Sequence, residues 1–213
     1  MTIMLIFDLD GTLWDSSVSV ADSWNILIRK ETGIDRGLKP EDIKRNMGKT
    51  MNQIADDLFG DLPEDERYAL ARKCEVYENS YITEHGGDLF DGVRETLAEL
   101  FRIGTQMAVV SNCQEGYIKA FLVSMDMAKY FADYEEWGRT GLLKADNIRL
   151  VMERNGVTKA IYIGDIQKDS DAAHEAGIPC ISADYGFGDI TDAEGRIEKF
   201  ADLPLELERL GYL

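Results

Sequence analysis

The stretch Ile3–Asp15, which reads IMLIFDLDGTLWD, constrains the fold of this chain more than any other. A short apolar run over Ile3–Phe7 predicts a buried strand, and two carboxylates, Asp8 and Asp10, follow it. Open parallel sheets bind their ligands outside the carboxyl ends of the strands, so both carboxylates are expected at the edge of a crevice. An Asp-x-Asp-Gly string by itself is equally typical of an ordinary turn. Its chemistry therefore depends on what the rest of the chain supplies.

Length, charge and composition exclude several classes of protein. The 213 residues are enough for a domain with an insert, and the net charge of −17 disfavours binding to nucleic acid or to an anionic membrane. No apolar stretch approaches the roughly 20 residues that span a membrane. The start lacks the features of a signal peptide, so we expect a cytoplasmic protein, either monomer or homodimer. Three cysteines and two histidines argue against a disulfide framework and against a zinc site.

The residues after the first strand are nearly all helical in pattern. We expect helices over residues 16–32, 40–47, 52–59 and 63–84, the last with Leu70, Cys74, Tyr77 and Tyr81 on one face. Such a run interrupts the alternation of strand and helix that a doubly wound domain requires. We therefore predict an inserted helical cap formed by residues 16–87, hinged near residues 15–18 and 86–91.

Strands and helices alternate again in the second half of the chain. Strands are expected over residues 106–110, 130–134, 160–163 and 180–183, with helices between them and a short helix over 202–210. The predicted fold is α/β, a doubly wound, Rossmann-like parallel sheet with the inserted α-helical cap. Its core comprises residues 1–15 and 88–213.

Polar residues follow three of the predicted strands, and parallel strands would collect them in one crevice. These residues are Asp8 and Asp10, then Ser111 and Asn112, then Asp165 with Asp169 in the loop after it. Several carboxylates cannot share a small pocket in ionised form without a cation. Mg²⁺ would satisfy them, with oxygens from Asp8, Asp165 and the main-chain carbonyl of Asp10, and would allow the pocket to accept phosphate.

Lys144 begins the predicted helix before the strand over residues 160–163. Its ammonium group there would hold Asp8 and phosphoryl oxygens together. Lys159 and Lys168 are nearby, but their positions are more typical of exposed surface.

As a set, these residues resemble the four motifs of the haloacid dehalogenase-like hydrolases, in the right order. The motifs are matched by Asp8 to Thr12, by Ser111, by Lys144, and by Gly164-Asp165 with Asp169. The helical insert between the first two motifs resembles the small cap of the phosphoglycolate phosphatase and β-phosphoglucomutase branch. Ala145 stands where members of the family often have proline.

The resemblance implies a role for each matched residue. Asp8 is expected to attack phosphorus and form an aspartyl phosphate, while Asp10 protonates the leaving oxygen and then activates water. Thr12, Ser111 and the main-chain amide of Asn112 are expected at the substrate. Lys144 and Mg²⁺ would neutralise charge in the transition state, and Asp169 would orient the metal shell.

The chemistry of Asp10 and the last motif separates the alternatives. A dehalogenase has no need of a general acid two residues after its nucleophile. A sugar phosphomutase remains the alternative, although such mutases tend to have Glu-Asp where this chain has Gly164-Asp165, and a basic residue soon after the serine. A silent binding protein would not need the complete set. We therefore expect a Mg²⁺-dependent phosphatase of a small phosphorylated metabolite, with Lys49 in the cap loop reaching an anionic substrate.

Overall fold

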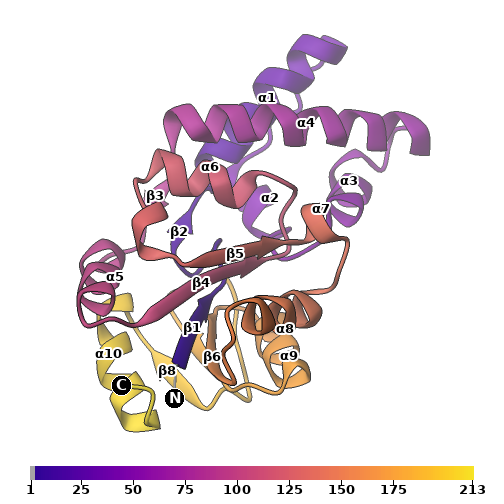
Figure 1. The fold of residues 1–213 in the computed structure, drawn as a ribbon. Coiled ribbons are helices and arrows are strands. Elements are labelled where there is room, and N and C mark those ends of the chain that lie inside the picture. Colours follow the sequence, from indigo (N-terminus) through magenta and orange to yellow (C-terminus); the bar gives the residue numbers. More distant parts are fainter. Residues whose placement is uncertain (1–2) are drawn as a thin grey trace.

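A six-stranded parallel sheet forms the centre of the protein, shown here as a computed structural model that describes residues 3–213 (Figure 1). In spatial order the strands are β5-β4-β1-β6-β7-β8. They comprise β1 (Ile3–Phe7), β4 (Gln106–Ser111), β5 (Asp133–Glu136), β6 (Lys159–Gly164), β7 (Cys180–Ala183) and β8 (Gly195–Ile197). Numbered among themselves, these strands have the order 3-2-1-4-5-6 of a doubly wound sheet, whose switch point lies at the carboxyl end of β1. The predicted fold class is confirmed.

The register of the sheet brings three strand ends to one place. Phe7 at the end of β1 pairs with Val109 of β4 on one side and with Ile163 of β6 on the other. The Asp8 N–H continues this ladder by donating to the Ile163 carbonyl at 2.8 Å. Residues just after these positions on all three strands therefore share one edge of the sheet.

Alternate side chains of β1 pack on opposite faces of the sheet. Met4 and Ile6 belong to an apolar cluster with helices α8 (Lys144–Arg154) and α9 (Gln167–Ala176). Leu5 and Phe7 belong to a larger cluster with α5 (Val93–Arg102), α6 (Tyr117–Ser124) and α10 (Leu203–Leu210). Helices thus cover both faces, which is why β1 is a continuous apolar run.

The helical insert lies at one end of the sheet, above the carboxyl ends of its strands in Figure 1. It contains α1 (Ser17–Thr32), α2 (Pro40–Lys44), α3 (Met51–Phe59) and α4 (Glu64–His85). The chain enters through β2 (Trp14–Asp15) and leaves through β3 (Asp88–Leu89), which pair as a small antiparallel ribbon. We propose that residues 16–87 form the cap and that residues 1–15 and 88–213 form the core, with residues 1–2 outside the described part. Among the described residues, no helix has the length and hydrophobicity that crossing a membrane requires.

Three local predictions were wrong. The helix expected over residues 40–47 ends at Lys44. The strand expected over residues 130–134 begins at Asp133, because Ala128–Tyr130 form a 3-10 turn from which Tyr130 packs against the core. The buried face of α4 is also rotated from the expected one. It holds Leu70, Ala71, Cys74, Glu78 and Ile82, while Tyr77 and Tyr81 are only partly buried. The buried face therefore includes a carboxylate, Glu78, which the expected face did not.

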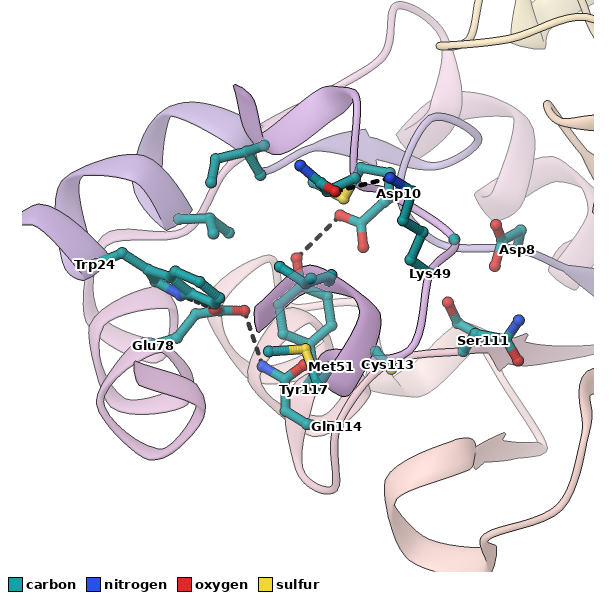
Figure 2. Close-up of a pocket in the computed structure, with 17 residues that line it drawn as sticks. Asp8, Asp10, Trp24, Lys49, Met51, Glu78, Ser111, Cys113, Gln114 and Tyr117 are labelled. Carbon is teal, nitrogen blue, oxygen red and sulfur yellow. Dashed lines mark hydrogen bonds between the residues drawn. The ribbon is translucent and has the colours of Figure 1, made fainter. Parts of the chain in front are cut away.

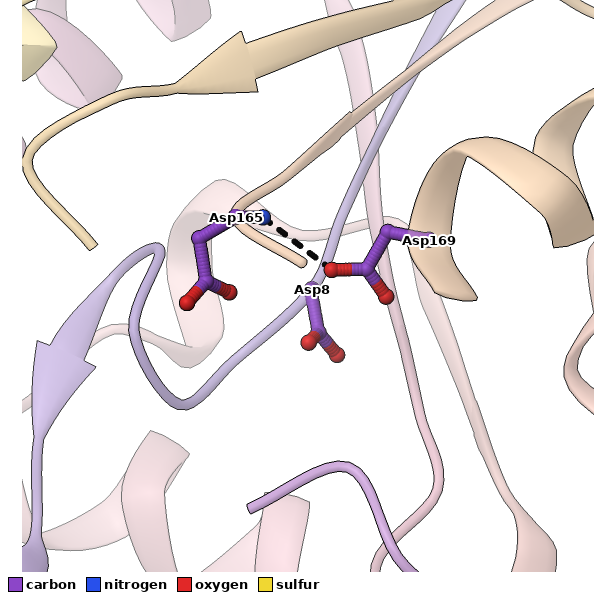
Figure 3. A group of neighbouring side chains, drawn as sticks. All are labelled: Asp8, Asp165 and Asp169. Carbon is purple, nitrogen blue, oxygen red and sulfur yellow. Dashed lines mark hydrogen bonds between the residues drawn. The ribbon is translucent and has the colours of Figure 1, made fainter. Parts of the chain in front are cut away.

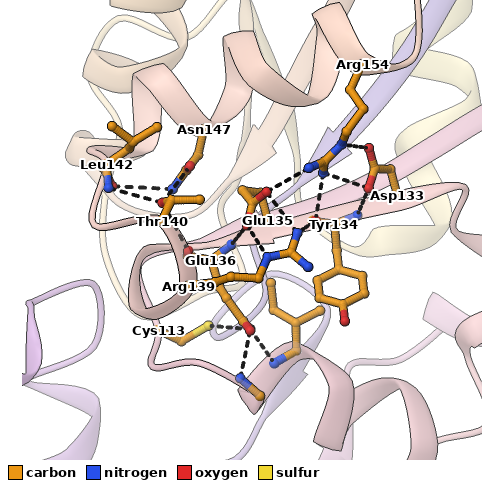
Figure 4. Close-up of polar contacts among 12 residues, drawn as sticks. Cys113, Asp133, Tyr134, Glu135, Glu136, Arg139, Thr140, Leu142, Asn147 and Arg154 are labelled. Carbon is orange, nitrogen blue, oxygen red and sulfur yellow. Dashed lines mark hydrogen bonds and ion pairs between the residues drawn. The ribbon is translucent and has the colours of Figure 1, made fainter.

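Charged residues secure β5 at the edge of the sheet (Figure 4). The buried Glu135 carboxylate receives the Arg139 guanidinium from α7 (Trp137–Thr140) at 2.7 Å and that of Arg154 from α8 at 2.9 Å. The neighbouring Glu136 carboxylate accepts N–H groups from Gly116 at 2.7 Å and from Ile118 at 3.2 Å. Glu136 thereby fixes the beginning of α6, directly after the loop that carries Ser111 and Asn112.

Candidate active site

Three carboxylates, shown in Figure 3, form a buried cluster with one ammonium group at the carboxyl ends of β1 and β6. Carboxylate oxygens of Asp8, Asp165 and Asp169 lie within 4.8 Å of one another. Lys144 Nζ lies 3.1 Å from Asp8 Oδ1 and 2.5 Å from Asp169 Oδ1. The structure thus brings together four of the predicted site residues.

Asp169 is held from two directions. It lies in the first turn of α9 rather than in the preceding loop, where the sequence placed it. Its Oδ2 accepts the backbone N–H groups of Asp165 at 3.0 Å and of Ile166 at 3.1 Å, while its Oδ1 faces Lys144. A carboxylate at a helix N-terminus is also stabilised by the helix dipole. Asp169 therefore fixes the position of the Lys144 ammonium group.

Backbone packs closely around Asp165. A Cβ atom added to Gly11, whose φ is +81°, would lie 2.1 Å from Asp165 Oδ2, and one added to Gly186 would lie 2.2 Å from Asp165 Cβ. The Phe187 N–H donates to Asp165 Oδ2 at 2.8 Å, and the Thr12 hydroxyl donates to Oδ1 at 3.3 Å. Thr12, expected at the substrate, therefore contacts a cluster carboxylate in this structure.

Burial and a surplus of negative charge shift the pKa values of the cluster carboxyls. Burial, followed by the charge of Asp169, raises the pKa of Asp8 to about 6, against the lowering effect of Lys144. Burial and the charges of Asp169 and Asp8 raise the pKa of Asp165 to about 8. Although burial lowers the pKa of Lys144, the charges of Asp169 and Asp8 raise it overall, so this side chain stays cationic.

The donor set of the cluster fits a divalent cation with hard oxygen ligands. Asp8 Oδ1 is buried and accepts no well-oriented hydrogen bond from the described residues, although Lys144 lies nearby. Carboxylate oxygens are the ligands that Mg²⁺ prefers. A divalent ion here would also offset the repulsion that raises the pKa of Asp8 and that of Asp165. The Asp10 carboxylate is not part of this cluster.

Asp10 has its own hydrogen-bonding partners. Its Oδ1 accepts the Ser16 hydroxyl at 2.7 Å and the Tyr117 hydroxyl at 3.0 Å, and these two hydroxyls are 2.7 Å apart. Burial raises the pKa of Asp10 to about 7, and the hydrogen bond from Ser16 opposes that rise. Sequence reasoning placed Ser16 only at the start of the helix expected over residues 16–32 and did not single out Tyr117. The structure assigns both to the carboxylate whose predicted role is proton transfer.

A pocket that opens to solvent lies between the insert and the sheet (Figure 2). Its lining includes the predicted residues Asp8, Asp10, Ser111, Asn112 and Lys49. Lys49 lines the pocket, but its Nζ lies 2.5 Å from Asp57 Oδ2 and donates to Asn46 Oδ1 at 3.0 Å. Most of the predicted site residues thus line the pocket. Those that do not are Thr12, Lys144, Asp165 and Asp169.

Besides Tyr117, sequence reasoning missed the carboxyl group of Glu78 in this pocket. Glu78 of α4 is only 4% exposed and accepts hydrogen bonds from the Trp24 indole and, at 2.8 Å, from Gln114 Nε2. All three residues line the pocket. The available signal was the spacing of residues 70, 71, 74, 78 and 82, which places Glu78 on the apolar face of its helix.

Comparison with known proteins agrees with this geometry. The sequence model of the family described as haloacid dehalogenase-like hydrolase matches residues 5–183. A phosphoglycolate phosphatase from Pseudomonas savastanoi pv. phaseolicola is 29% identical over 195 residues, which cover 86% of this chain and 70% of the relative.

Solved structures share the fold. A predicted phosphatase from Clostridium acetobutylicum superposes with a TM-score of 0.79 at 24% identity, covering 98% of this chain and 99% of that one. The β-phosphoglucomutase from Clostridium difficile superposes with a TM-score of 0.73 at 19% identity, covering 100% of this chain and 97% of that one. The family match spans both the first strand and the acidic cluster after β6. The chain therefore belongs to the haloacid dehalogenase-like hydrolases.

Proposed function

We propose that this chain, a haloacid dehalogenase-like phosphatase, hydrolyses a small phosphomonoester with Mg²⁺ and through an aspartyl phosphate. One observation carries the proposal. The buried Asp8 carboxylate lies 3.1 Å from the Lys144 ammonium and borders the same pocket as Asp10. Phosphoryl transfer needs a nucleophile, an acid and a charge-stabilising cation. Asp8 and Asp10 follow the same strand, β1, and Lys144 brings the cation from α8.

In the first step, an Asp8 carboxylate oxygen forms a bond to phosphorus and the bond to the leaving oxygen breaks. Asp10 gives its proton to that oxygen. In the second step, Asp10 as carboxylate takes a proton from water, whose oxygen then attacks phosphorus, releases phosphate and restores Asp8. The raised pKa of Asp10, about 7, supports this double role, because a group that titrates near neutral pH serves as acid and as base.

The other site residues would stabilise negative charge on the phosphoryl oxygens and position the phosphoryl group. Ser111 and the main-chain amide of Asn112 would donate to phosphoryl oxygens from the loop that Glu136 anchors. Asp8, Asp165 and the main-chain carbonyl of Asp10 would hold Mg²⁺, which supplies positive charge against the phosphoryl oxygens. Asp169 would act by fixing Lys144, to which it lies 2.5 Å away.

The mutase alternative is less well supported. The curated relative described above is a phosphatase, and the structural likeness to a β-phosphoglucomutase reflects the fold alone. A Cβ atom added to Gly164 would lie 2.5 Å from the Asp169 Cβ. The glutamate that mutases of this type tend to have before the last motif's aspartate would therefore not fit here without movement of Asp169.

The test is phosphate release from p-nitrophenyl phosphate and a panel of phosphorylated metabolites, with Mg²⁺ or with a chelator. The panel covers phosphoglycolate, sugar phosphates, nucleoside monophosphates and pyrophosphate. We expect Mg²⁺-dependent release that the Asp8→Asn variant loses. Asp65→Asn, which removes an exposed carboxylate from the first turn of α4, is the matched control and should behave as wild type. Equal turnover by Asp8→Asn, or turnover that a chelator leaves unchanged, would contradict the mechanism.

A further inference from the structure

The pocket has two ends of different character. Asp8, Ser111 and Lys49 lie at one end in Figure 2, while Glu78, Trp24 and Gln114 lie at the other, and Asp10 and Tyr117 lie between them. If Asp8 takes the phosphoryl group and Asp10 protonates the leaving oxygen, the leaving group extends past Asp10 toward Glu78. This orientation rests on the proposed function. The end of the pocket that contains Glu78, Trp24 and Gln114 is called the distal end below.

Protein acceptors already use the hydrogen-bond donors of the distal end. The single N–H of the Trp24 indole donates to Glu78 Oε2. Gln114 Nε2 donates to Glu78 Oε1 at 2.8 Å and to Asn79 Oδ1 at 3.2 Å, which accounts for both protons of that amide. Burial raises the pKa of Glu78 to about 8, although the hydrogen bonds from Gln114 and Trp24 oppose that rise, so the carboxyl is largely ionised only above about pH 8. In the ionised form each Glu78 oxygen keeps a further lone pair. The distal end then offers acceptors to a ligand, and a ligand must bring the donor.

The charges near the distal end also disfavour a second anion on the substrate. The carboxylic acids of the lining are Asp8, Asp10 and Glu78, and its one basic residue is Lys49. Lys49 lies at the opposite end in Figure 2, and Asp57 already pairs with its ammonium group. Much of the remaining lining is apolar, including Val20, Ile43, Met47, Met51 and Ile54. A carboxylate in the leaving group would meet Glu78 with no cation beside it.

We propose that Glu78 determines specificity by accepting a hydrogen bond from a hydroxyl or protonated amino group of the substrate's leaving group. The substrate is then a phosphomonoester of an alcohol that carries such a donor and no second anionic group. Trp24 and Gln114 position the Glu78 carboxylate for this contact. This chain would therefore differ in substrate from enzymes that hydrolyse phosphoglycolate, because the leaving group of phosphoglycolate ends in a carboxylate.

Three phosphomonoesters of nearly equal size test the proposal. Phosphoglycolate, 2-hydroxyethyl phosphate and O-phosphoethanolamine place a carboxylate, a hydroxyl and an ammonium group at the same distance from phosphorus. The assays are run at pH 9, where Glu78 is largely ionised. We expect kcat/KM there to favour each of the latter two over phosphoglycolate by about tenfold or more, as expected for one hydrogen bond to a charged group. Glycerol 1-phosphate and 3-phosphoglycerate form a second, longer pair, in which we expect glycerol 1-phosphate to be preferred.

The Glu78→Gln variant should reduce these ratios by about tenfold, because an uncharged amide neither attracts ammonium nor repels carboxylate. A ratio measured on one preparation is unaffected by the fraction of active protein, so partial misfolding does not obscure it. Glu84→Gln removes an exposed carboxylate of the same helix and should keep the wild-type ratios.

Failure of the proposed function and failure of the role of Glu78 would give different results. No phosphate release from any ester, including p-nitrophenyl phosphate, would reject the proposed function itself. Turnover of p-nitrophenyl phosphate without preference in either matched pair would overturn the role of Glu78 alone. Preference for phosphoglycolate would overturn it as well, and would mean that Glu78 carries a proton and donates it to the carboxylate. Ratios unchanged in Glu78→Gln would show that the preference arises elsewhere.

Discussion

The Lys144→Met substitution tests whether one cation holds the acidic cluster together. The Lys144 side chain is 4% exposed, and its two partners, Asp8 and Asp169, are 6% and 0% exposed. Methionine keeps much of the apolar stem but leaves two buried carboxylates without their counter-charge. Breaking a buried ion pair from one side costs about 3–5 kcal/mol of stability. We expect a loss of that size at pH 7.5 in the presence of a chelator.

The sign of the pH dependence sharpens this prediction. The folded-state pKa of Asp8, about 6, lies above its ordinary value of 3.8. The stability linked to Asp8 is therefore fully present below pH 3.8 and is lost as the pH rises through about 6. Without Lys144 this pKa rises further, so the loss with increasing pH becomes steeper. The deficit of Lys144→Met should thus be smaller at pH 5, where Asp8 is largely protonated in both proteins.

Urea unfolding at 25 °C, followed by circular dichroism at pH 5 and at pH 7.5, measures both quantities. Lys129→Met is the matched control, because Lys129 is an exposed lysine that pairs with Asp126 three residues away. It should unfold like the wild type at both pH values. A deficit for Lys144→Met below about 1 kcal/mol, or one that does not change with pH, would refute the view that Lys144 compensates the cluster.

Two further substitutions test the neighbouring contacts. Tyr117→Phe removes a hydrogen bond that lowers the pKa of Asp10, so the pH profile of kcat/KM should move to higher pH; an unmoved profile, or a move to lower pH, would contradict the role of Tyr117. Gly186→Ala would place a Cβ atom 2.2 Å from the Asp165 Cβ, and overpacking of this kind costs about 1–3 kcal/mol. The alanine variant should also show a smaller rise in melting temperature on addition of MgCl₂ than wild type. An equal rise would mean that Asp165 keeps its position or does not hold the metal.

The sequence predicts most reliably where a local pattern is enough. β1 is a short apolar run that lies between β4 and β6 in the sheet. The two carboxylates, Asp8 and Asp10, follow it within three residues, so one short stretch of sequence shows both the strand and its functional residues. Lys144 was placed by its order between motifs, and it does begin α8. These features depend on sequence neighbours or on motif order, both of which the chain displays directly.

Contacts between distant segments were not predictable in this way. Tyr117 reaches Asp10 across 107 positions, and Glu78 reaches Trp24 across 54. A glutamate in a helix is ordinarily exposed, and only its partners make the burial of Glu78 tolerable. The strands β2 and β3 contain two residues each, too few for any periodicity. The strand β5 begins later than predicted. Tyrosine is a residue type that favours strands, but Tyr130 lies in a 3-10 turn and packs against the core from there.

The ribbon formed by β2 and β3 bears on how such a protein diversifies. Asp15 pairs directly with Asp88, so the chain leaves the core and returns to it at adjacent points. An insertion whose ends already touch can be exchanged for another of different length with little change in the path of the core. Glu78 and Trp24 lie within this exchangeable segment, whereas Asp8, Lys144 and Asp165 lie outside it. Descendants of one ancestral core can therefore acquire new substrate preferences by replacing a module, while the residues that handle phosphorus are inherited intact.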